Sequence, residues 1–180
     1  MTAQLDISAN RQHRNYGRRT QAGRVLWWLC QPLFRLSPRP LWVWRIWLLR
    51  AFGAQVGQGV HIHPTVRVTM PWNLCLGDQA AVGDRAILYA LGQISIGARA
   101  TVSQNAHLCT GSHDHHDPAR PLRKRPIVID DDAWVCADAF VGPGVRIGAG
   151  AILGARAVAM HDVAPGKIGI GNPLLIRDPQ

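Results

Sequence analysis

The chain has 180 residues, a length that suits one domain with a short appendage. Its four cysteines show no paired spacing and no C-x-x-C motif, which excludes a disulfide scaffold and predicts reduced thiols in a cytosolic protein. The formal net charge is +9, but the basic residues form no recognition motif for nucleic acid, so we expect no nucleic-acid partner.

The first 52 residues carry most of the positive charge. They contain nine arginines against one acidic residue, together with five of the seven tryptophans of the chain. Segments 24–36 and 40–52 are predicted to be helical. Pro40 suits the first turn of the second helix, and Gly53 suits the position just past its end.

This basic N-terminal segment is too interrupted to cross a bilayer. Pro32 breaks the first stretch, and Arg45 and Arg50 break the second well short of the ~20 apolar residues that a span needs. The first 20 residues are polar and basic, so we expect no cleavable signal peptide. Two compatible interpretations remain. The helices cap one end of the fold with their arginines facing water, or they lie on an anionic membrane surface.

From residue 56 to residue 159, an aliphatic residue recurs at every sixth position with a few short phase shifts. This period matches neither a plain strand nor a helix, and it is the hexapeptide repeat of a parallel β-helix. Three hexads form one triangular coil, so we predict an all-β fold of about five coils. Residues 53–180 form the β-helix domain and residues 1–52 a helical extension. The inward positions are Val56, Ile62, Val68, Leu76, Val82, Leu88, Ile96, Val102, Leu108, Ile129, Val135, Val141, Ile147 and Leu153.

Small residues often follow the inward position of a hexad. Glycine stands there at Gly57, Gly77 and Gly97, among others, and we expect these glycines to adopt the positive φ that a tight corner requires. Cys109 and Cys136 also follow inward aliphatic residues, and we expect them to act as small packing residues.

The largest break in the repeat lies after Leu108. The next coil should open near residue 114, but the pattern restarts only at Ile127. Residues 114–126 are therefore predicted to form one extruded loop. Loops on rigid scaffolds often carry function, so this loop marks the candidate site.

Three histidines, His113, His115 and His116, stand at the start of this loop. His115 and His116 cannot easily face one ion, and no fourth ligand stands at a recognised spacing, so we expect no metal site. The other interpretation is a histidine general base, because the unperturbed pKa of histidine lies near physiological pH. The adjacent Asp114 or a backbone carbonyl would hold the tautomer of such a base.

Several motifs resemble the left-handed β-helix acyltransferases of the hexapeptide-repeat superfamily, and most of all their colanic acid biosynthesis acetyltransferases. The likeness runs over nearly the whole chain from about residue 24. The hexads identify only the fold, whereas the T-G-S-H-D and A-W-V-C-A-D-A-F-V-G-P-G-V blocks are more specific. The matching stretches are L-R-A-F-G-A (49–54), P-W-N-L (71–74), C-T-G-S-H-D (109–114), A-W-V-C-A-D-A-F-V-G-P-G-V (133–145) and G-N-P (171–173).

The resemblance implies a homotrimer that binds acetyl-CoA, the acyl donor, in the groove between neighbouring β-helices. His113 stands where related sugar acetyltransferases have their general base. Asn105 matches an asparagine at the same spacing in those enzymes, although a plain corner role explains it equally well. Trp134 matches a tryptophan of the pantetheine channel, or it packs over the coil surface. Ala137 and Ala155 match positions whose backbone groups bind pantetheine.

The same resemblance places the phosphates of CoA near the last coil. Arg156, Lys167 and Arg177 are the candidate cations there. The chain departs from the family at residues 174–175, where two leucines replace the usual basic residue after G-N-P. Arg177 is expected to serve in its place.

These features predict a cytoplasmic, acetyl-CoA-dependent O-acetyltransferase that acts on a sugar of an exopolysaccharide or its lipid-linked precursor. A lipid-linked acceptor would explain an N-terminal segment in peripheral contact with the inner leaflet of the cytoplasmic membrane. One alternative is a metalloenzyme like the γ-class carbonic anhydrases, which would use His61, His63 and His107. The other is a non-enzymatic, membrane-associated β-helix scaffold.

Overall fold

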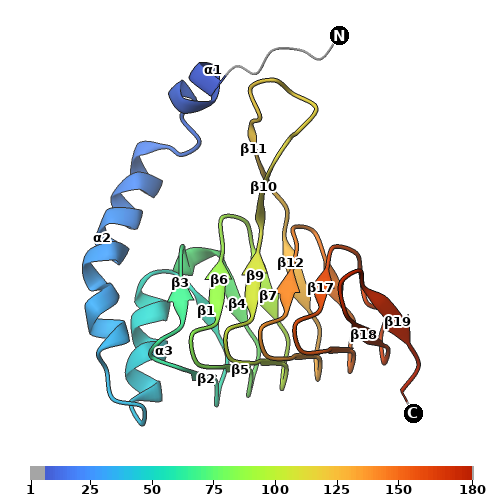
Figure 1. The fold of residues 1–180 in the computed structure, drawn as a ribbon. Coiled ribbons are helices and arrows are strands. Elements are labelled where there is room, and N and C mark those ends of the chain that lie inside the picture. The colour runs from blue at the N-terminus through green and yellow to red at the C-terminus, as the bar shows by residue number, and fades with distance from the viewer. Residues whose placement is uncertain (1–6, 180) are drawn as a thin grey trace.

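The computed structural model describes residues 7–179 as a stack of β-coils with helices at one end and a hairpin arm at one edge (Figure 1). Helix α2 (Arg18–Arg35) and helix α3 (Trp42–Ala51) cover the two segments predicted to be helical. Helix α1 (Ile7–Gln12) was not predicted. Pro40 lies in the turn before α3 rather than in its first turn, and Gly53, with φ of 86°, follows the helix end as expected.

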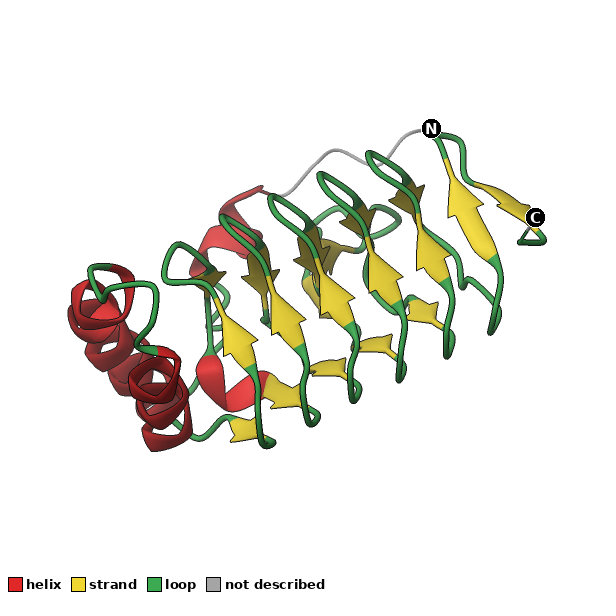
Figure 2. Cartoon of the chain, turned by 90° about the horizontal axis from the view of Figure 1, so that it is seen from below, coloured by secondary structure: helices red, strands yellow, loops and turns green. Residues whose placement is uncertain are grey.

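Short parallel strands build three flat faces that run the length of the stack (Figure 2). The first face contains β1 (Gln55–Val56), β4 (Leu74–Leu76), β7 (Ile94–Ile96), β12 (Ile127–Ile129) and β15 (Arg146–Ile147). The second contains β2 (His61–Ile62), β5 (Ala81–Val82), β8 (Thr101–Val102), β13 (Trp134–Val135), β16 (Ile152–Leu153) and β18 (Ile168–Ile170), with β19 (Leu175–Arg177) antiparallel at its edge. The third contains β3 (Arg67–Val68), β6 (Ile87–Tyr89), β9 (His107–Cys109), β14 (Phe140–Val141) and β17 (Val158–Ala159). A short 3-10 helix, η1 (Pro71–Asn73), joins the first coil to the second.

The stack contains about six coils, one more than predicted. Five coils contribute a strand to each of the three faces. The last coil is incomplete, because Val163 makes only an isolated bridge to Ile147 on the first face and β18 alone continues the second. The hexad pattern ends at residue 159, which explains why the sequence did not reveal this final coil.

The interior is a continuous column of aliphatic side chains. Every inward aliphatic residue predicted from the hexads is buried except Val56, which is partly buried at the first coil. Parallel registers place equivalent residues above one another, as in the run Ile62, Val82, Val102 and Val135 on the second face. This column confirms the predicted repeat, because each coil buries its inward side chains against the coils next to it.

The expected role of the glycines that follow the inward positions was wrong. Positive φ falls two residues later, on Gln79 (59°) after Gly77 and on Arg99 (58°) after Gly97. A Cβ atom on Gly77 would stand 2.6 Å from the backbone nitrogen of Ala98 in the next coil. Glycine is required there because neighbouring coils approach closely, and the L-residues at the corners adopt the left-handed conformation themselves.

Helices α2 and α3 cap the first coil. Trp27 of α2 is buried, and its indole nitrogen donates a 2.7 Å hydrogen bond to the carbonyl of Val68. Phe34, Leu48 and Leu49 belong to the same core cluster as the coils. The helices of residues 1–52 and the coils of residues 53–180 thus share one hydrophobic core. Whether the two parts fold as separate units stays a prediction.

Arg45 is buried in this cap and does not face water. Its side chain is 0% exposed, and its Nε donates to the carbonyl of Ile62 at 2.7 Å. The remaining guanidinium nitrogens donate to the hydroxyl of Ser37 and the carbonyls of Pro38 and Arg39 at 2.6–2.9 Å. The expectation that Arg45 sits on the wet side of the cap was wrong, because four backbone and side-chain acceptors replace its hydration.

The extruded segment forms a β-hairpin, called the arm below. Strand β10 (Gly111–His113) pairs antiparallel with β11 (Leu122–Lys124), so the arm begins three residues before the predicted 114–126 loop. Buried Thr110 anchors its base. The hydroxyl of Thr110 donates to the carbonyl of Tyr89 and accepts from the backbone N–H of Gly92, both at 2.8 Å. The arm leaves the stack between β9 and β12, at the edge between the third and first faces (Figure 1).

Candidate active site

His113 is the last residue of β10, on the arm. Its Nδ1 lies 2.6 Å from the carbonyl oxygen of Arg120, across the loop of the hairpin. Because a carbonyl can only accept, Nδ1 carries the proton, and Nε2 is left as the basic nitrogen of the neutral ring. The side chain is exposed and lines an open hollow of about 470 Å³ with Ser112, Arg123 and Arg125. A general base needs this combination of a fixed tautomer and an accessible second nitrogen.

Asp114 does not hold the ring of His113. Its carboxylate accepts a 2.7 Å hydrogen bond from Arg123 of β11 and a 3.1 Å bond from the backbone N–H of His116. The hydrogen bond from Arg123 is the main reason why the pKa of Asp114 lies below its ordinary value. Of the two orienting groups that the sequence left open, the geometry favours the backbone carbonyl, whereas Asp114 braces the two sides of the arm.

His115 and His116 lie together at the exposed turn, with ring centroids 3.9 Å apart. Within residues 7–179, no group of three or more His, Cys, Asp or Glu side chains is placed to hold a metal ion. His61 and His63 contact Trp42 of the cap, and His107 lies between Tyr89 and Phe140 on the third face. The carbonic anhydrase alternative gains no support from these positions.

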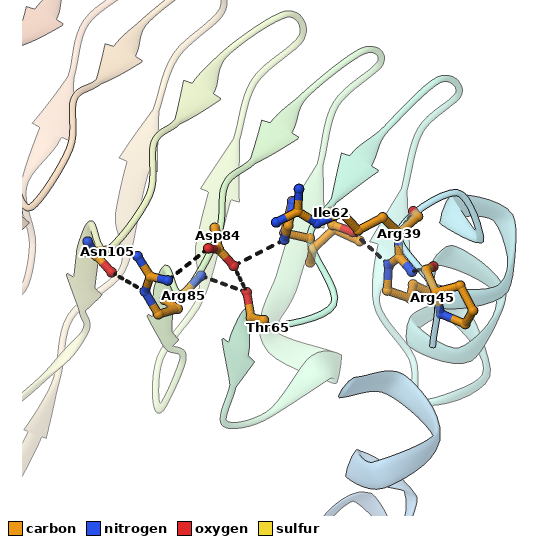
Figure 3. A network of polar contacts seen from close by, with 9 residues as sticks. Arg39, Arg45, Ile62, Thr65, Asp84, Arg85 and Asn105 are labelled. Atoms are coloured by element: carbon orange, nitrogen blue, oxygen red, sulfur yellow. Dashed lines mark hydrogen bonds and ion pairs between the residues drawn. The ribbon is translucent and has the colours of Figure 1, made fainter. Parts of the chain in front are cut away.

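Asn105 occupies a coil corner between the second and third faces, with φ of 58°. Its amide oxygen accepts a 2.9 Å hydrogen bond from Nε of Arg85, the equivalent corner residue one coil earlier. Figure 3 shows this contact continuing through Asp84 and Thr65 toward the cap. The hydrogen bond from Thr65 is the main reason why the pKa of Asp84 is lowered. Asn105 therefore serves as a left-handed corner residue. Its amide oxygen is used by Arg85, and its NH₂ group is the part of the side chain that can still donate a hydrogen bond.

The residues proposed to bind the donor lie along the second face and its corners. Trp134 of β13 is exposed and donates a 2.8 Å hydrogen bond from Nε1 to the hydroxyl of Ser103. Ala137 and Ala155 occupy successive corners, and the backbone N–H of Arg156 donates to the carbonyl of Ala137 at 2.9 Å. Ala155 is exposed and Ala137 half-buried, and neither has a side chain beyond Cβ to cover its corner.

The three candidate cations are at the C-terminal end of the same face. Lys167 precedes β18 and forms an ion pair with Asp178. Arg177 of β19 stands opposite Ile168 of β18, which places it beside Lys167. Arg156 is exposed at its corner, and among the described residues neither Arg156 nor Arg177 is paired with an acid. Arg156 and Arg177 are therefore the more available partners for phosphate.

One chain does not bring all these candidates together. Asn105, Ala137, Ala155 and Arg156 lie at the edge between the second and third faces, whereas His113 lies on the arm at the edge between the third and first faces. On the third coil, the three residues of β9 separate the two edges by about 10 Å. Each chain thus presents a candidate base on one edge and a candidate donor groove on another.

Sequence reasoning did not identify two groups at this site. The carbonyl of Arg120 holds His113, but a backbone acceptor leaves no signature in residue type. Arg123 was seen only as one of several cations in the loop, and its role as the partner of Asp114 depends on the hairpin register that pairs Ser112 with Arg123.

Comparison with known proteins adds sequence relatives. No family model matches the chain. It is 46% identical over 152 residues to a protein of Escherichia coli (strain K12) named "Putative colanic acid biosynthesis acetyltransferase WcaF", and the match covers 84% of each protein. It is 23% identical over 129 residues to the galactoside O-acetyltransferase of the same strain, covering 70% of this chain and 64% of that relative.

Solved structures share the fold over nearly the whole chain. A maltose O-acetyltransferase from Clostridium difficile 630 matches with a TM-score of 0.83 and 20% identity, covering 98% of both chains. A galactoside acetyltransferase in complex with coenzyme A matches with a TM-score of 0.84 and 21% identity, covering 95% of this chain and 87% of the other. These likenesses confirm the predicted left-handed parallel β-helix.

Proposed function

The chain belongs to the hexapeptide-repeat acyltransferases, in the family of the colanic acid biosynthesis acetyltransferase WcaF, and we propose that it transfers an acetyl group from acetyl-CoA to a sugar hydroxyl of an exopolysaccharide or its precursor. The observation that carries this proposal is the geometry of His113. Its Nδ1 is held by the Arg120 carbonyl, and its Nε2 is accessible at the arm. Nε2 is thus placed to accept a proton.

In the proposed reaction, Nε2 of His113 takes the proton of the acceptor hydroxyl as that oxygen attacks the thioester carbonyl carbon of acetyl-CoA. The tetrahedral intermediate collapses with cleavage of the carbon–sulfur bond. CoA leaves as a thiolate and receives the proton from the imidazolium, and the sugar carries the new acetate ester. A positioned base contributes roughly 10²–10⁴ in rate, and alignment of hydroxyl and thioester contributes more.

The donor is proposed to lie along the edge between the second and third faces. Trp134 would flank the pantetheine arm, and the backbone groups at Ala137 and Ala155 would bind its amides. Arg156 and Arg177 would face the phosphates, with Lys167 nearby. This assignment is supported by the small side chains at these two corners and by two arginines with no acidic partner in the described part of the chain.

We propose that the enzyme works as a homotrimer. The base and the donor groove lie on different edges of one chain, so a complete site forms when the arm of one subunit meets the groove of its neighbour. The protein should sediment at three times its 19.8 kDa chain mass.

Subunit mixing tests the shared site directly. His113→Ala removes the base, and Ala155→Trp blocks the groove on the other edge, so each variant alone should be inactive. Co-expressed at equal levels, the two should recover about a quarter of the wild-type activity, because about a quarter of the interfaces then combine an intact arm with an intact groove. No recovery would place the site within one chain.

The N-terminal helices are proposed to hold the enzyme on the cytoplasmic leaflet of an anionic membrane. None of the helices described between residues 7 and 179 is long and apolar enough to span a bilayer. However, α2, α3 and the turn after α2 expose large apolar side chains, among them Leu36 (84%), Val43 (80%) and Trp28 (69%). Trp44 and Trp47 stack at 5.4 Å on the same helical cap, and Arg35 borders the apolar groove at Trp28. This pairing of aromatic and basic residues suits an interfacial segment facing a lipid-linked acceptor.

Liposome sedimentation tests this attachment. Binding should occur with anionic vesicles at low salt and weaken at high salt or with neutral vesicles. The double variant Arg35→Gln/Arg39→Gln should bind more weakly, whereas Arg85→Gln, on a coil corner, serves as the matched control. Arg45 is unsuitable for this test because it is buried. Wild-type protein that stays in the supernatant with anionic vesicles would contradict the proposal.

The acetyl transfer itself is tested with a panel of acceptors. Purified protein is incubated with acetyl-CoA and with galactosides, maltose or lipid-linked oligosaccharides, and products are weighed by mass spectrometry. We expect at least one saccharide to gain the mass of one acetyl group with release of free CoA. Binding of acetyl-CoA without transfer to any saccharide would contradict the proposed reaction and favour the non-enzymatic scaffold.

A further inference from the structure

The carbonyl of Arg120 accepts two side-chain hydrogen bonds. One comes from Nδ1 of His113 at 2.6 Å, and the other comes from Nδ2 of Asn10, on helix α1, at 2.7 Å. The same Nδ2 also lies 2.7 Å from the carbonyl of Ala119. We propose that Asn10 is a positioning residue for His113: it fixes the Arg120 carbonyl, and this carbonyl fixes the tautomer and direction of the imidazole.

The backbone at Arg120 explains why such a brace is needed. Arg120 has φ of 45°, and among the described residues it is the one non-glycine residue with positive φ that lies outside the coil corners. At the corners, neighbouring coils stack against the turn on both sides and hold it. The arm has no such neighbour, so a left-handed residue at its tip depends on local contacts.

Further contacts hold the N-terminal segment against the arm. Lys124 of β11 lies with its Nζ 4.0 Å from the ring centroid of Tyr16 and 3.4 Å from the carbonyl of Asn15. Arg24 of α2 lies 4.7 Å from the same ring. Tyr16 therefore links the base of the arm to α2, and Asn10 links α1 to its tip. Two separate points of attachment make the orientation of the arm depend on the N-terminal segment.

The consequence follows from the chemistry of imidazole. A carbonyl oxygen has two lone pairs, so it can accept from Asn10 and from His113 together. While it does so, the proton stays on Nδ1 and the lone pair of Nε2 faces away from Arg120. If the carbonyl turns away, the proton can move to Nε2, and the ring is then unable to accept a proton from a hydroxyl at that atom. This inference rests on the proposed role of His113 as the base, but the brace can be measured without turnover.

The brace is tested by ¹⁵N NMR of histidine-labelled protein above pH 8, where the neutral tautomers are observed. The His113 signal is identified by its loss in His113→Gln. We expect wild-type protein to show His113 with a protonated Nδ1, and Asn10→Ala and Asn10→Asp to show a mixture of both tautomers. Gln12→Ala, an exposed change on the same short helix, is the matched control and should retain the wild-type spectrum.

Kinetics provide the second readout. In Asn10→Ala, kcat should fall about tenfold, a part of the roughly 10²–10⁴ that a positioned base supplies, while KM for acetyl-CoA stays within twofold. An unchanged His113 tautomer or an unchanged kcat in Asn10→Ala would overturn the proposal. If wild-type protein acetylates no saccharide, the proposed function fails, and the tautomer measurement still decides whether Asn10 positions His113.

Discussion

In the coil stack, each inward side chain rests on equivalent side chains of the coils before and after it, and each corner turns against the next. In the arm, one pair of three-residue strands extends away from the stack and is held by a few polar contacts at Thr110, Arg120 and Lys124. The two regions therefore have different roles. The stack supplies stability through many repeated contacts, and the arm carries the candidate base through a few specific ones.

The two regions should therefore respond differently to mutation. A change in the column of the stack should alter the free energy of unfolding, because a buried cavity cannot be filled by its neighbours. A change in the arm should alter the chemistry with little effect on stability. Loss of stability should therefore be large for variants of the stack and small for variants of the arm, and an arm variant that unfolds the protein would contradict this division.

The largest effect is expected in the column. Leu108→Ala removes a fully buried side chain of β9 and should lower the free energy of unfolding by about 2–5 kcal/mol. Leu122→Ala, at a half-buried residue of the arm strand β11, should lower the free energy of unfolding by less than about 1 kcal/mol. Denaturant unfolding of both variants measures the difference. Equal losses would show that the arm belongs to the same cooperative core.

A slightly smaller effect is expected at the cap. Arg45→Ala would leave the carbonyls of Ile62, Pro38 and Arg39 without their donor inside the cap. Hydrogen bonds to charged groups contribute about 1.5–3 kcal/mol, and buried acceptors left without a donor are a further cost. We therefore expect the free energy of unfolding to fall by about 3 kcal/mol. Arg35→Ala replaces an exposed residue at the end of α2, and its free energy of unfolding should stay within about 0.5 kcal/mol of the wild-type value. Thermal melts of the two variants provide the comparison, and matching melting temperatures would contradict the buried role of Arg45.

The smallest effect concerns pH. Burial lowers the pKa of His107, which lies between Tyr89 and Phe140 on the third face. Below about pH 6.5 the unfolded chain protonates His107, whereas the folded chain still holds it neutral. The free energy of unfolding therefore falls as the pH drops from about 6.5 toward the lower pKa of the folded state. The slope is at most about 1.4 kcal/mol per pH unit. Between pH 7.5 and pH 5.5, wild-type protein should lose more stability than His107→Leu. Identical losses would show that His107 does not contribute.

The stack could be predicted almost entirely from the sequence, because its cause is periodic. An aliphatic residue returns at each inward position, and the burial of Ile62, Val102 and Val141 follows from it. The glycines were placed correctly but explained wrongly, since the distance between coils, visible only in three dimensions, decides why Gly77 lacks a side chain.

The arm and the cap could be predicted only in part. The position of the extrusion followed from the missing hexad after Leu108, and His113 was singled out by resemblance rather than by physical argument. Its hydrogen-bond partner is a backbone carbonyl, which any residue at position 120 would supply. Arg45 was expected to face water with the other arginines of the cap, and the carbonyls that accept its hydrogen bonds belong to segments brought together by the fold.

The proposed reaction depends most on His113 as the base, and one set of measurements tests this role. Turnover with acetyl-CoA and a responsive saccharide is measured for wild-type protein and His113→Ala, together with the dissociation constant for CoA and the unfolding midpoint. We predict a kcat at least about 10²-fold lower, CoA binding within a few-fold of wild type and an unchanged midpoint, because the variant removes a proton acceptor on the arm and no part of the core. A His113→Ala enzyme that turns over at nearly the wild-type rate would show that His113 is not the base.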